Sequence, residues 1–136
     1  MINIYIDGAC AANGSEDAKM GIGVVIEWQE GQPLILSKFG GHGTNNIAEY
    51  SALNEALILI HKHEIKSAKI LSDSNLVVSQ VTGKWKCKDS KLIPLCDLAC
   101  RRIADLSNKG YEIKVEYIPR IMNIADTPAK NGYRNA

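Results

Sequence analysis

The first residues of the chain alternate between apolar and more polar side chains. Ile2, Ile4 and Ile6 recur at every second position, which is the period of a strand with one buried face. The run ends in Asp7, directly followed by Gly8. We therefore predict a strand that ends in a carboxylate with open space beside it.

Further apolar runs follow, separated by turn residues. The segment 30–33 is rich in turn formers, and glycines at positions 40, 41 and 43 break the third run. Short connections favour antiparallel pairing, so the first three strands are expected to form a meander. The pattern predicts strands at 2–7, 21–28, 34–39, 68–72 and 112–118, and helices near 46–62, 74–81, 91–107 and 123–132.

The helix predicted at 46–62 carries an acid where an apolar residue is expected. Glu49, Leu53, Ala56 and Ile60 share one face at helical spacing, so the glutamate heads the core-facing stripe. Buried carboxylates are rare unless they are paired or bind a metal. A first-turn acid that favours the helix dipole is the alternative reading. Glu55 lies off the stripe and is expected to be solvated.

A second acid, Asp73, directly follows the strand predicted at 68–72. A helix separates this strand from the first one, which predicts parallel pairing and places Asp7 and Asp73 at the same sheet edge. Glu49 is expected to join them, with Asp126 as a possible fourth acid. Clustered carboxylates repel one another, and oxygen ligands alone select Mg²⁺ or Mn²⁺. The cluster predicts metal-assisted phosphoryl transfer.

Composition narrows the class of protein. The 136 residues suit one domain, expected to span 1–136, and 16 basic against 15 acidic residues leave a net charge of +1. Any nucleic-acid affinity must therefore come from local clusters. No apolar run is long enough for a transmembrane helix, and a secretory signal is absent. The four cysteines form no CxxC pair and are expected to be reduced thiols of a cytoplasmic protein.

Four short motifs together resemble the signatures of ribonuclease H type 1. They cover almost the whole chain in the family's order and spacing: Asp7-Gly8-Ala9-Cys10, Thr44-Asn45-Asn46-Ile47-Ala48-Glu49-Tyr50, Ser72-Asp73-Ser74 and Asn123-Ile124-Ala125-Asp126. The resemblance implies an α/β fold with a five-stranded mixed sheet, three antiparallel strands followed by two parallel ones, flanked by helices. It also implies endonucleolytic cleavage of the RNA strand of RNA–DNA hybrids, leaving 5′-phosphate and 3′-hydroxyl ends.

The resemblance further implies two Mg²⁺ ions as cofactors, with Mn²⁺ as a substitute. Asp7 would bridge the two ions, which lie about 3.5–4 Å apart in such sites, with Glu49 and Asp73 completing their shells. Asp126 would hold the second ion, and Gly8 belongs to the same metal-binding motif as Asp7. Glu49 would also lie near the ribose 2′-hydroxyl, the group that distinguishes RNA from DNA.

Several polar residues match family positions that contact the hybrid. The expected contacts to its minor groove and sugars are Asn13, Asn45, Asn46 and Asn75. Thr44 matches a contact to a phosphate of the DNA strand. A helix cap with loop amides is an equally good reading of the two neighbouring asparagines.

The connector between the second and third predicted helices carries a compact basic patch around one aromatic residue, made of Lys84, Trp85, Lys86, Lys88 and Lys91. Some relatives insert a basic helix here as a hybrid-binding handle, and this connector is too short for one. The patch is expected to grip the DNA strand through phosphate contacts and stacking. A solvated loop in which Trp85 covers the core is the alternative.

The fourth motif departs from the family in two ways. Many relatives carry a mobile His just before the fourth acid, and residues 119–125 contain none. The pattern places the last helix near 123–132, but proline disfavours helical geometry in the preceding residue, so we expect the helix to start only at Thr127–Pro128, with Asp126 just before it. A capping or loop acid is the alternative reading of Asp126.

Other protein classes fit less well. Exonucleases of related fold carry a D-x-E first motif, which Asp7-Gly8-Ala9 lacks, and sugar-kinase or actin-like ATPases need a duplicated domain. A catalytically weak or inactive domain that binds hybrids or protein partners remains the alternative function. The chain is expected to act as a monomer without a membrane partner.

Overall fold

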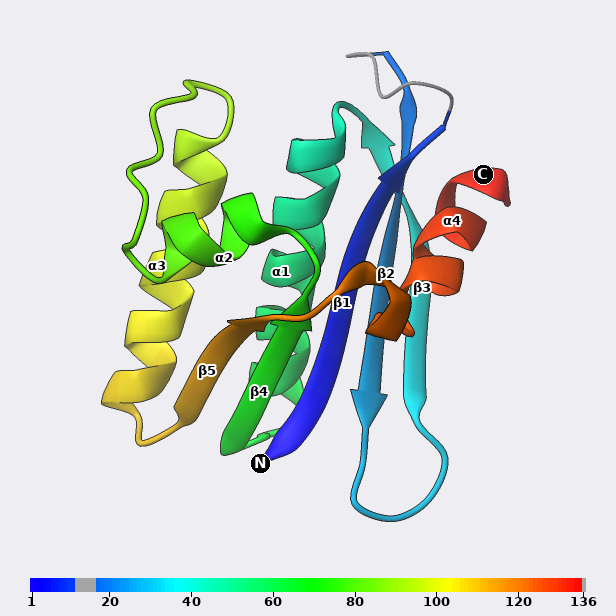
Figure 1. Ribbon diagram of the computed structural model, residues 1–136. Helices are drawn as coiled ribbons and strands as arrows, with labels where there is room; N and C mark the ends of the chain where they lie inside the picture. Colours follow the sequence, from blue (N-terminus) through cyan, green and yellow to red (C-terminus); the bar gives the residue numbers. More distant parts are fainter. Residues whose placement is uncertain (12–16, 136) are drawn as a thin grey trace.

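The computed structural model of the protein describes residues 1–11 and 17–135, so Asn13 lies outside the described residues. Figure 1 shows a central sheet with helices on both faces. The strands are β1 (Ile2–Cys10), β2 (Lys19–Glu27), β3 (Leu34–His42), β4 (Ser67–Ser72) and β5 (Glu112–Tyr117). The helices are α1 (Asn45–Lys62), α2 (Asn75–Val81), α3 (Ile93–Asn108), the 3₁₀ turn η1 (Arg120–Met122) and α4 (Asp126–Arg134).

The sheet has the order β3-β2-β1-β4-β5. Its first three strands are antiparallel, and β4 and β5 run parallel to β1 and to each other. This arrangement confirms the predicted fold class. The parallel pairs follow from the helical connections, because α1 lies between β3 and β4 in the chain and α2 and α3 lie between β4 and β5.

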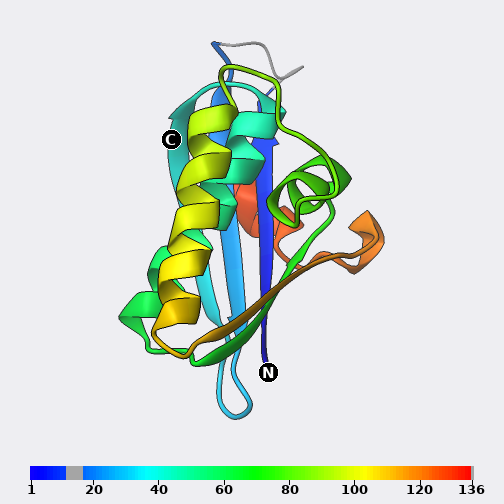
Figure 2. The same cartoon turned by 90° about the vertical axis from the view of Figure 1, so that its left-hand side faces the viewer.

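The main core lies between the sheet and the pair α1 and α3. Figures 1 and 2 show these two helices side by side on one face, while α4 covers β2 and β3 on the other. The even-numbered residues Ile4 and Ile6 of β1 point into this core, together with Leu53 and Ile60 of α1. Alternation in the strand and helical spacing in α1 thus place their apolar side chains in one layer, whose burial drives folding.

The first strand is longer than predicted, because it continues past Asp7 to Cys10. Its pairing with β4 stops at Ile6, opposite Ser72, whereas its pairing with β2 continues to Cys10, opposite Met20. Asp7 is therefore the first residue of β1 beyond the end of its parallel neighbour. The open space beside this carboxylate comes from the end of β4 and not from the end of β1.

The third strand also runs longer than predicted, through the glycines that were expected to break it. It ends at His42, with a register shift in its pairing to β2 between Lys19 and Gly21. Gly41 has a φ of +89°, a backbone conformation that other residues rarely adopt. The glycines therefore allow an irregular strand end instead of terminating the strand.

Helix α4 lies directly on the backbone of β2 and β3. A Cβ atom at Gly23 would come within 2.6 Å of the Ala125 carbonyl oxygen, and one at Gly21 would collide with Ala129. A Cβ atom at Gly132 of α4 would collide with the Lys38 carbonyl oxygen. Three residues without side chains thus fix the distance between α4 and the sheet.

Three further observations concern the surroundings of Glu55, the state of the cysteines and the character of the helices. Glu55 was expected to be solvated only, but its carboxylate forms an ion pair with Lys38 Nζ at 2.8 Å. All four cysteines are free thiols. Among the described residues, no helix combines the length and the apolar character that crossing a membrane requires.

Candidate active site

Three carboxylates meet at the sheet edge where β1 extends beyond β4. Asp7 comes from β1, Asp73 follows β4, and Glu49 lies near the start of α1. One oxygen of each lies within 4.8 Å of the others, and we call this group the acidic cluster. Asp7 is 5% exposed and Glu49 is 8% exposed. The structure thus brings together three of the four acids that the sequence singles out.

The side chain of Glu49 is held by the main chain of β1. The Gly8 amide donates a hydrogen bond to Glu49 Oε1 at 2.6 Å. A Cβ atom at Gly8 would collide with the Ala48 carbonyl, so the glycine allows α1 to approach the strand this closely. Gly8 therefore contributes to the cluster through its amide, by orienting the glutamate.

The electrostatics of the acidic cluster are unfavourable without a cation. Burial raises the pKa of Asp7 to about 6, with Asp73 and Asp126 adding to the rise and a hydrogen bond with Glu49 opposing it. Burial and then Asp7 raise the pKa of Glu49 well above its ordinary value, although the Gly8 amide opposes this. Among the described residues, no basic side chain forms an ion pair with these three acids.

The donor set suits a hard divalent cation. Glu49 Oε2 is buried without a hydrogen-bond partner in the described part of the chain, a costly state that coordination would relieve. All three donors are carboxylate oxygens, the ligands that Mg²⁺ and Mn²⁺ prefer. Asp7, Glu49 and Asp73 can therefore hold such an ion.

The fourth acid, Asp126, lies inside the first turn of α4, so the prediction that the helix starts after it is wrong. Pro128 is the third residue of α4, where a backbone N–H has no partner within the helix, and the proline is therefore tolerated. Asp126 is close enough to raise the pKa of Asp7, but it lies outside the acidic cluster. It forms ion pairs with Lys130 at 3.1 Å and with the exposed Arg120 at 4.0 Å.

The side chain of Asn123 connects the parts of this site. Its Nδ2 donates to the Ile6 carbonyl oxygen at 2.9 Å and to Asp73 Oδ2 at 3.1 Å. Its Oδ1 accepts from the Ala125 amide at 3.1 Å, next to Asp126. One buried amide thus links β1, Asp73 and the start of α4. In the sequence Asn123 stands only as the first residue of a motif, and no local pattern signals these contacts.

Most of the expected substrate contacts lie at the starts of helices beside the acidic cluster. Thr44 is the N-cap of α1, where its hydroxyl accepts from the Ile47 amide at 3.3 Å. Asn45 and Asn46 follow with exposed side chains, and the exposed Asn75 opens α2, where its Oδ1 accepts from the Ser79 hydroxyl at 3.2 Å. Capping and substrate binding are compatible for this group, because the amides face solvent while the threonine caps the helix.

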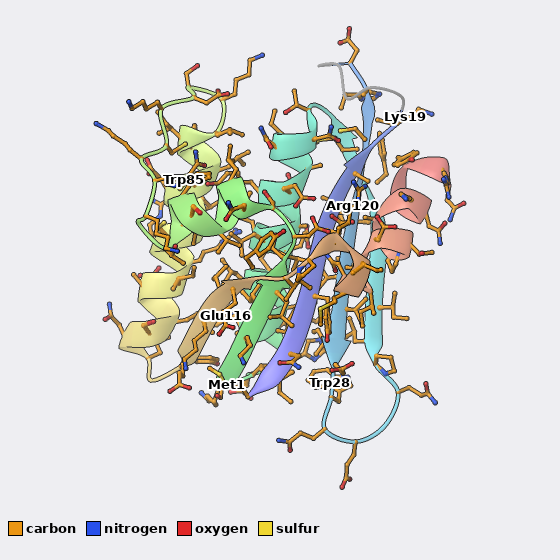
Figure 3. All side chains as sticks on the ribbon, in the orientation of Figure 1. Met1, Lys19, Trp28, Trp85, Glu116 and Arg120 are labelled. Carbon is orange, nitrogen blue, oxygen red and sulfur yellow. The ribbon has the colours of Figure 1, made fainter. Side chains whose placement is uncertain are left out.

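The basic patch lies on the connector between α2 and α3. Lys84, Lys86 and Lys88 are exposed, and Trp85 is 49% exposed, so the indole does not simply cover the core. Figure 3 shows Trp85 beside α2 and Arg120 on the turn before α4, well apart from each other. The structure therefore places basic groups on two different sides of the site.

The sequence of the chain is similar to those of known proteins. A family model described as reverse transcriptase-like matches residues 6–132. The chain is 40% identical over 82 residues to a ribonuclease H of Clostridium botulinum, covering 60% of this chain and 53% of that one. The chain thus spans about half the length of this relative.

Solved structures extend the match to the whole chain. The N-terminal RNase H domain of Rv2228c from Mycobacterium tuberculosis matches with a TM-score of 0.83 and 31% identity, over 98% of this chain and 94% of that one. LC11-RNase H1, solved in complex with an RNA/DNA hybrid, matches with a TM-score of 0.81 and 30% identity, over 99% of this chain and 98% of that one.

Proposed function

The chain belongs to the ribonuclease H type 1 family, and we propose that it hydrolyses the RNA strand of RNA–DNA hybrids, leaving 5′-phosphate and 3′-hydroxyl ends. The observation that carries this proposal is the acidic cluster, which gathers three partly uncompensated carboxylates at an open sheet edge. The likeness to a structure that contains an RNA/DNA hybrid supports the choice of substrate.

The chain's own residues would prepare the site for chemistry. Asp7, Glu49 and Asp73, with Asp126, would hold Mg²⁺ or Mn²⁺ ions, which lower the pKa of bound water and neutralise charge at the leaving oxygen. The Gly8 amide keeps the Glu49 carboxylate in place. Asp126 would exchange its contacts to Lys130 and Arg120 for this role.

Discrimination of RNA from DNA would come from the groups around the acidic cluster. Glu49 and the exposed amides of Asn45, Asn46 and Asn75 offer hydrogen-bonding partners for ribose 2′-hydroxyls and minor-groove edges. Thr44, at the start of α1, would face a phosphate of the DNA strand, since helix starts attract anions. We propose Asn13 for a similar sugar contact from its place in the sequence alone.

A cleavage assay tests this function. Wild-type protein is incubated with Mg²⁺ or Mn²⁺ and with labelled hybrid, double-stranded RNA, double-stranded DNA, or DNA containing a single ribonucleotide. We expect cleavage of the hybrid RNA strand alone, with a longer ribonucleotide run required. Asp7→Asn should abolish it, whereas Asp97→Asn, an exposed acid on α3, should retain it.

Two outcomes would overturn the proposal. Full activity of Asp7→Asn would exclude the mechanism. Tight hybrid binding by a wild-type protein that cleaves nothing would instead favour the alternative, a binding domain of the same fold.

A further inference from the structure

A pocket of about 320 Å³ opens at the end of the sheet that lies opposite the acidic cluster. It is lined by residues 1–2 at the start of β1, residues 28–29 after β2, and residues 63–67, which join α1 to β4. Figure 3 shows Met1 and Trp28 at this same end of the sheet. Small-molecule sites span roughly 300–1,000 Å³, so the pocket is large enough for a small ligand. We call it the distal pocket.

The apolar part of the distal pocket suits a flat aromatic ring. Ile65 is buried there, and Ile2 and Trp28 are half-buried. His63 packs edge-on against Trp28, with ring centroids 5.8 Å apart and ring planes at 69°. In the described part of the chain, no aromatic side chain is stacked flat on the indole. A planar ligand can therefore stack on Trp28, as nucleic-acid bases do on aromatic side chains.

The distal pocket also holds one positioned cation, Lys66. The Lys66 Nζ atom lies 4.2 Å from the centre of the Tyr111 ring. Within residues 1–11 and 17–135, Lys66 forms no ion pair with an acid. The aromatic ring positions the ammonium group without neutralising its charge, so Lys66 is available to an anionic ligand.

The acid of the distal pocket, Glu64, has an unfavourable backbone conformation. Its φ is +51°, and among the described residues it is the only non-glycine with a positive φ. The residue follows the C-cap of α1, where the Glu64 amide donates to the His61 carbonyl oxygen and the Ile65 amide donates to that of Ile60. Glycine is favoured at this position. A strained residue in a pocket points to a role in ligand binding.

We propose that the distal pocket binds a guanine nucleotide, of which the 5′-monophosphate is the smallest form. The base stacks on Trp28, its N1–H and exocyclic amino group donate to the Glu64 carboxylate, and the phosphate meets Lys66. Guanine presents two adjacent donors on this edge, which match the two oxygens of a carboxylate. An acidic peptide would be repelled by Glu64, and a cationic ligand by Lys66. The charge pattern therefore selects a ligand with an aromatic donor edge and an anionic tail.

The distal pocket and the acidic cluster can be occupied at the same time. Asp7 follows Ile2 by five residues along β1, which separates the two sites by about 17 Å. A nucleotide in the pocket leaves the sheet edge at Asp7 open to the hybrid. The proposal does not depend on the cleavage activity.

Quenching of tryptophan fluorescence tests the proposal. The chain contains two tryptophans, so Trp85→Phe leaves Trp28 as the only reporter. The titration is made in a chelator, which removes metal ions from the acidic cluster. We expect guanosine 5′-monophosphate to quench Trp28 saturably, with a dissociation constant below about 1 mM. Adenosine 5′-monophosphate and unphosphorylated guanosine should each bind at least fivefold more weakly.

Two variants assign the contacts. Lys66→Gln should weaken binding of the monophosphate at least fivefold and leave binding of guanosine unchanged. Glu64→Gly should remove the preference for guanine over adenine, while the midpoint of its urea unfolding rises because glycine fits the positive φ. A purely structural role of Glu64 would not join a gain in stability to a loss of selectivity. The charge controls are Asp97→Asn and Lys114→Gln, both at exposed residues outside the pocket.

Three results would overturn the proposal. They are the absence of saturable quenching by guanosine 5′-monophosphate, equal affinity of the wild type for the guanine and adenine nucleotides, and displacement of the nucleotide by RNA–DNA hybrid. Hybrid cleavage with saturating nucleotide should stay within twofold of the free rate. Because the titration needs no cleavage, a failure of this proposal is distinguished from a failure of the proposed function.

Discussion

The acidic cluster and the turn that carries Asp126 hold negative charge in opposite ways. Asp7, Glu49 and Asp73 project from a strand, a helix and a strand end, and no described basic residue pairs with them. Asp126 lies in the first turn of a short helix and is paired with Lys130 and Arg120. The cluster is therefore rigid and uncompensated, whereas the fourth acid is compensated in part by side chains that can move, although its Oδ1 is buried without a hydrogen-bond partner among the described residues.

The difference indicates that the acidic cluster and Asp126 have different roles in the reaction. A rigid group of like charges suits permanent ion binding, because coordination removes a repulsion that the fold otherwise maintains. An acid with replaceable partners suits a contact that forms and breaks during the reaction. Arg120, in the segment before the fourth acid, and Lys130, one turn after it on α4, are the two cations that the described part of the chain offers beside it.

The largest expected effect compares one acid from each region. Asp73→Asn should lower hybrid cleavage by about a thousandfold, roughly 4 kcal/mol of barrier, because it removes a charge from the rigid cluster. Asp126→Asn should lower it only about tenfold, since the amide keeps one oxygen and Lys130 already offsets the lost charge. Steady-state kinetics in Mg²⁺ measure both, with Asp97→Asn as the control. Equal losses would remove the distinction between the two regions.

The second prediction concerns stability in the absence of metal. Burial raises the pKa of Asp7 in the folded protein to about 6, from 3.8 for a free aspartate carboxyl. Folding therefore binds protons, and this contribution is present below pH 3.8 and lost as the pH rises through 6. The loss is roughly 3 kcal/mol, from about 1.4 kcal/mol for each unit of pKa.

Urea unfolding in a chelator, between about pH 4 and pH 7, measures this loss. We expect Asp7→Asn to be more stable than the wild type near pH 7 and to show a flatter pH dependence. Adding Mg²⁺ should stabilise the wild type more than the variant. A variant less stable than the wild type at neutral pH would show that the cluster is not repulsive.

The third prediction tests Asn123, whose side chain links the acidic cluster to the start of α4. Asn123→Ala should lower kcat about tenfold with little change in KM, because Asp73 and the start of α4 lose their common partner. It should also cost about 1–3 kcal/mol of stability, since the Ile6 carbonyl is left unpaired. The Mg²⁺ concentration for half-maximal activity should rise, which a purely structural defect would not produce. Asn131→Ala on α4 is the matched control, and an unchanged Mg²⁺ requirement would exclude a positioning role.

The smallest effect is expected at the basic patch, outside both regions. Replacing Lys84, Lys86, Lys88 and Lys91 with Gln should raise KM several-fold and flatten its salt dependence, without changing kcat. A control variant with the same change in net charge should leave KM nearly unchanged. It replaces Lys62, Lys66, Lys109 and Lys114 with Gln. If both sets of variants match the wild type, the patch is a solvated loop.

Local patterns in the sequence predict much of the fold. Strand alternation and the helical spacing of Leu53 and Ile60 are properties of neighbouring residues, so burial follows directly from them. The helical spacing also identifies Glu49, because an acid is unexpected in a stripe of otherwise apolar residues. The parallel placement of Asp7 and Asp73 follows from the helical crossover between their strands.

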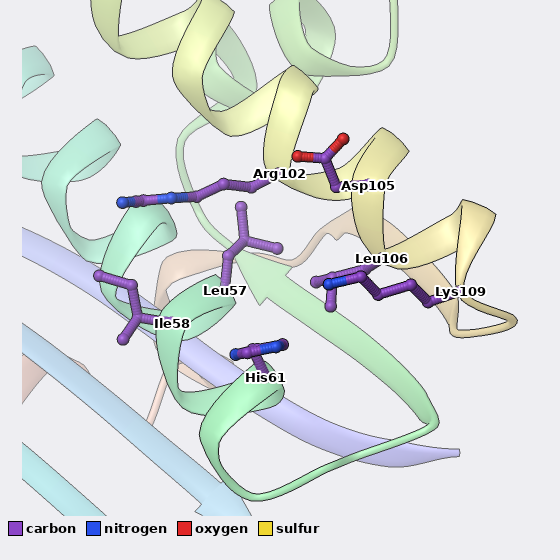
Figure 4. A pocket seen from close by; sticks show the side chains of 7 residues that line it. All are labelled: Leu57, Ile58, His61, Arg102, Asp105, Leu106 and Lys109. Carbon is purple, nitrogen blue, oxygen red and sulfur yellow. The ribbon is translucent and has the colours of Figure 1, made fainter.

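Other features depend on contacts between distant residues, which no local pattern contains. The opening beside Asp7 depends on where β4 ends, and the start of α4 depends on how this helix packs against Gly21 and Gly23. The contacts of Asn123 join residues that are 117 and 50 positions apart. A pocket lined by residues such as Leu57 of α1 and Leu106 of α3 (Figure 4) arises from packing between these two helices, and its lining is scattered along both.

The contact between Gly8 and Ala48 has a consequence for how this protein can evolve. Strand and helix meet here through their backbones, so this contact fixes the position of Glu49 against β1 directly. Core residues can therefore drift through apolar substitutions while the active site keeps its geometry. A single methyl group added at position 8 would displace the helix and its glutamate together. We therefore expect the site to accept apolar substitutions in the core more readily than any side chain at position 8.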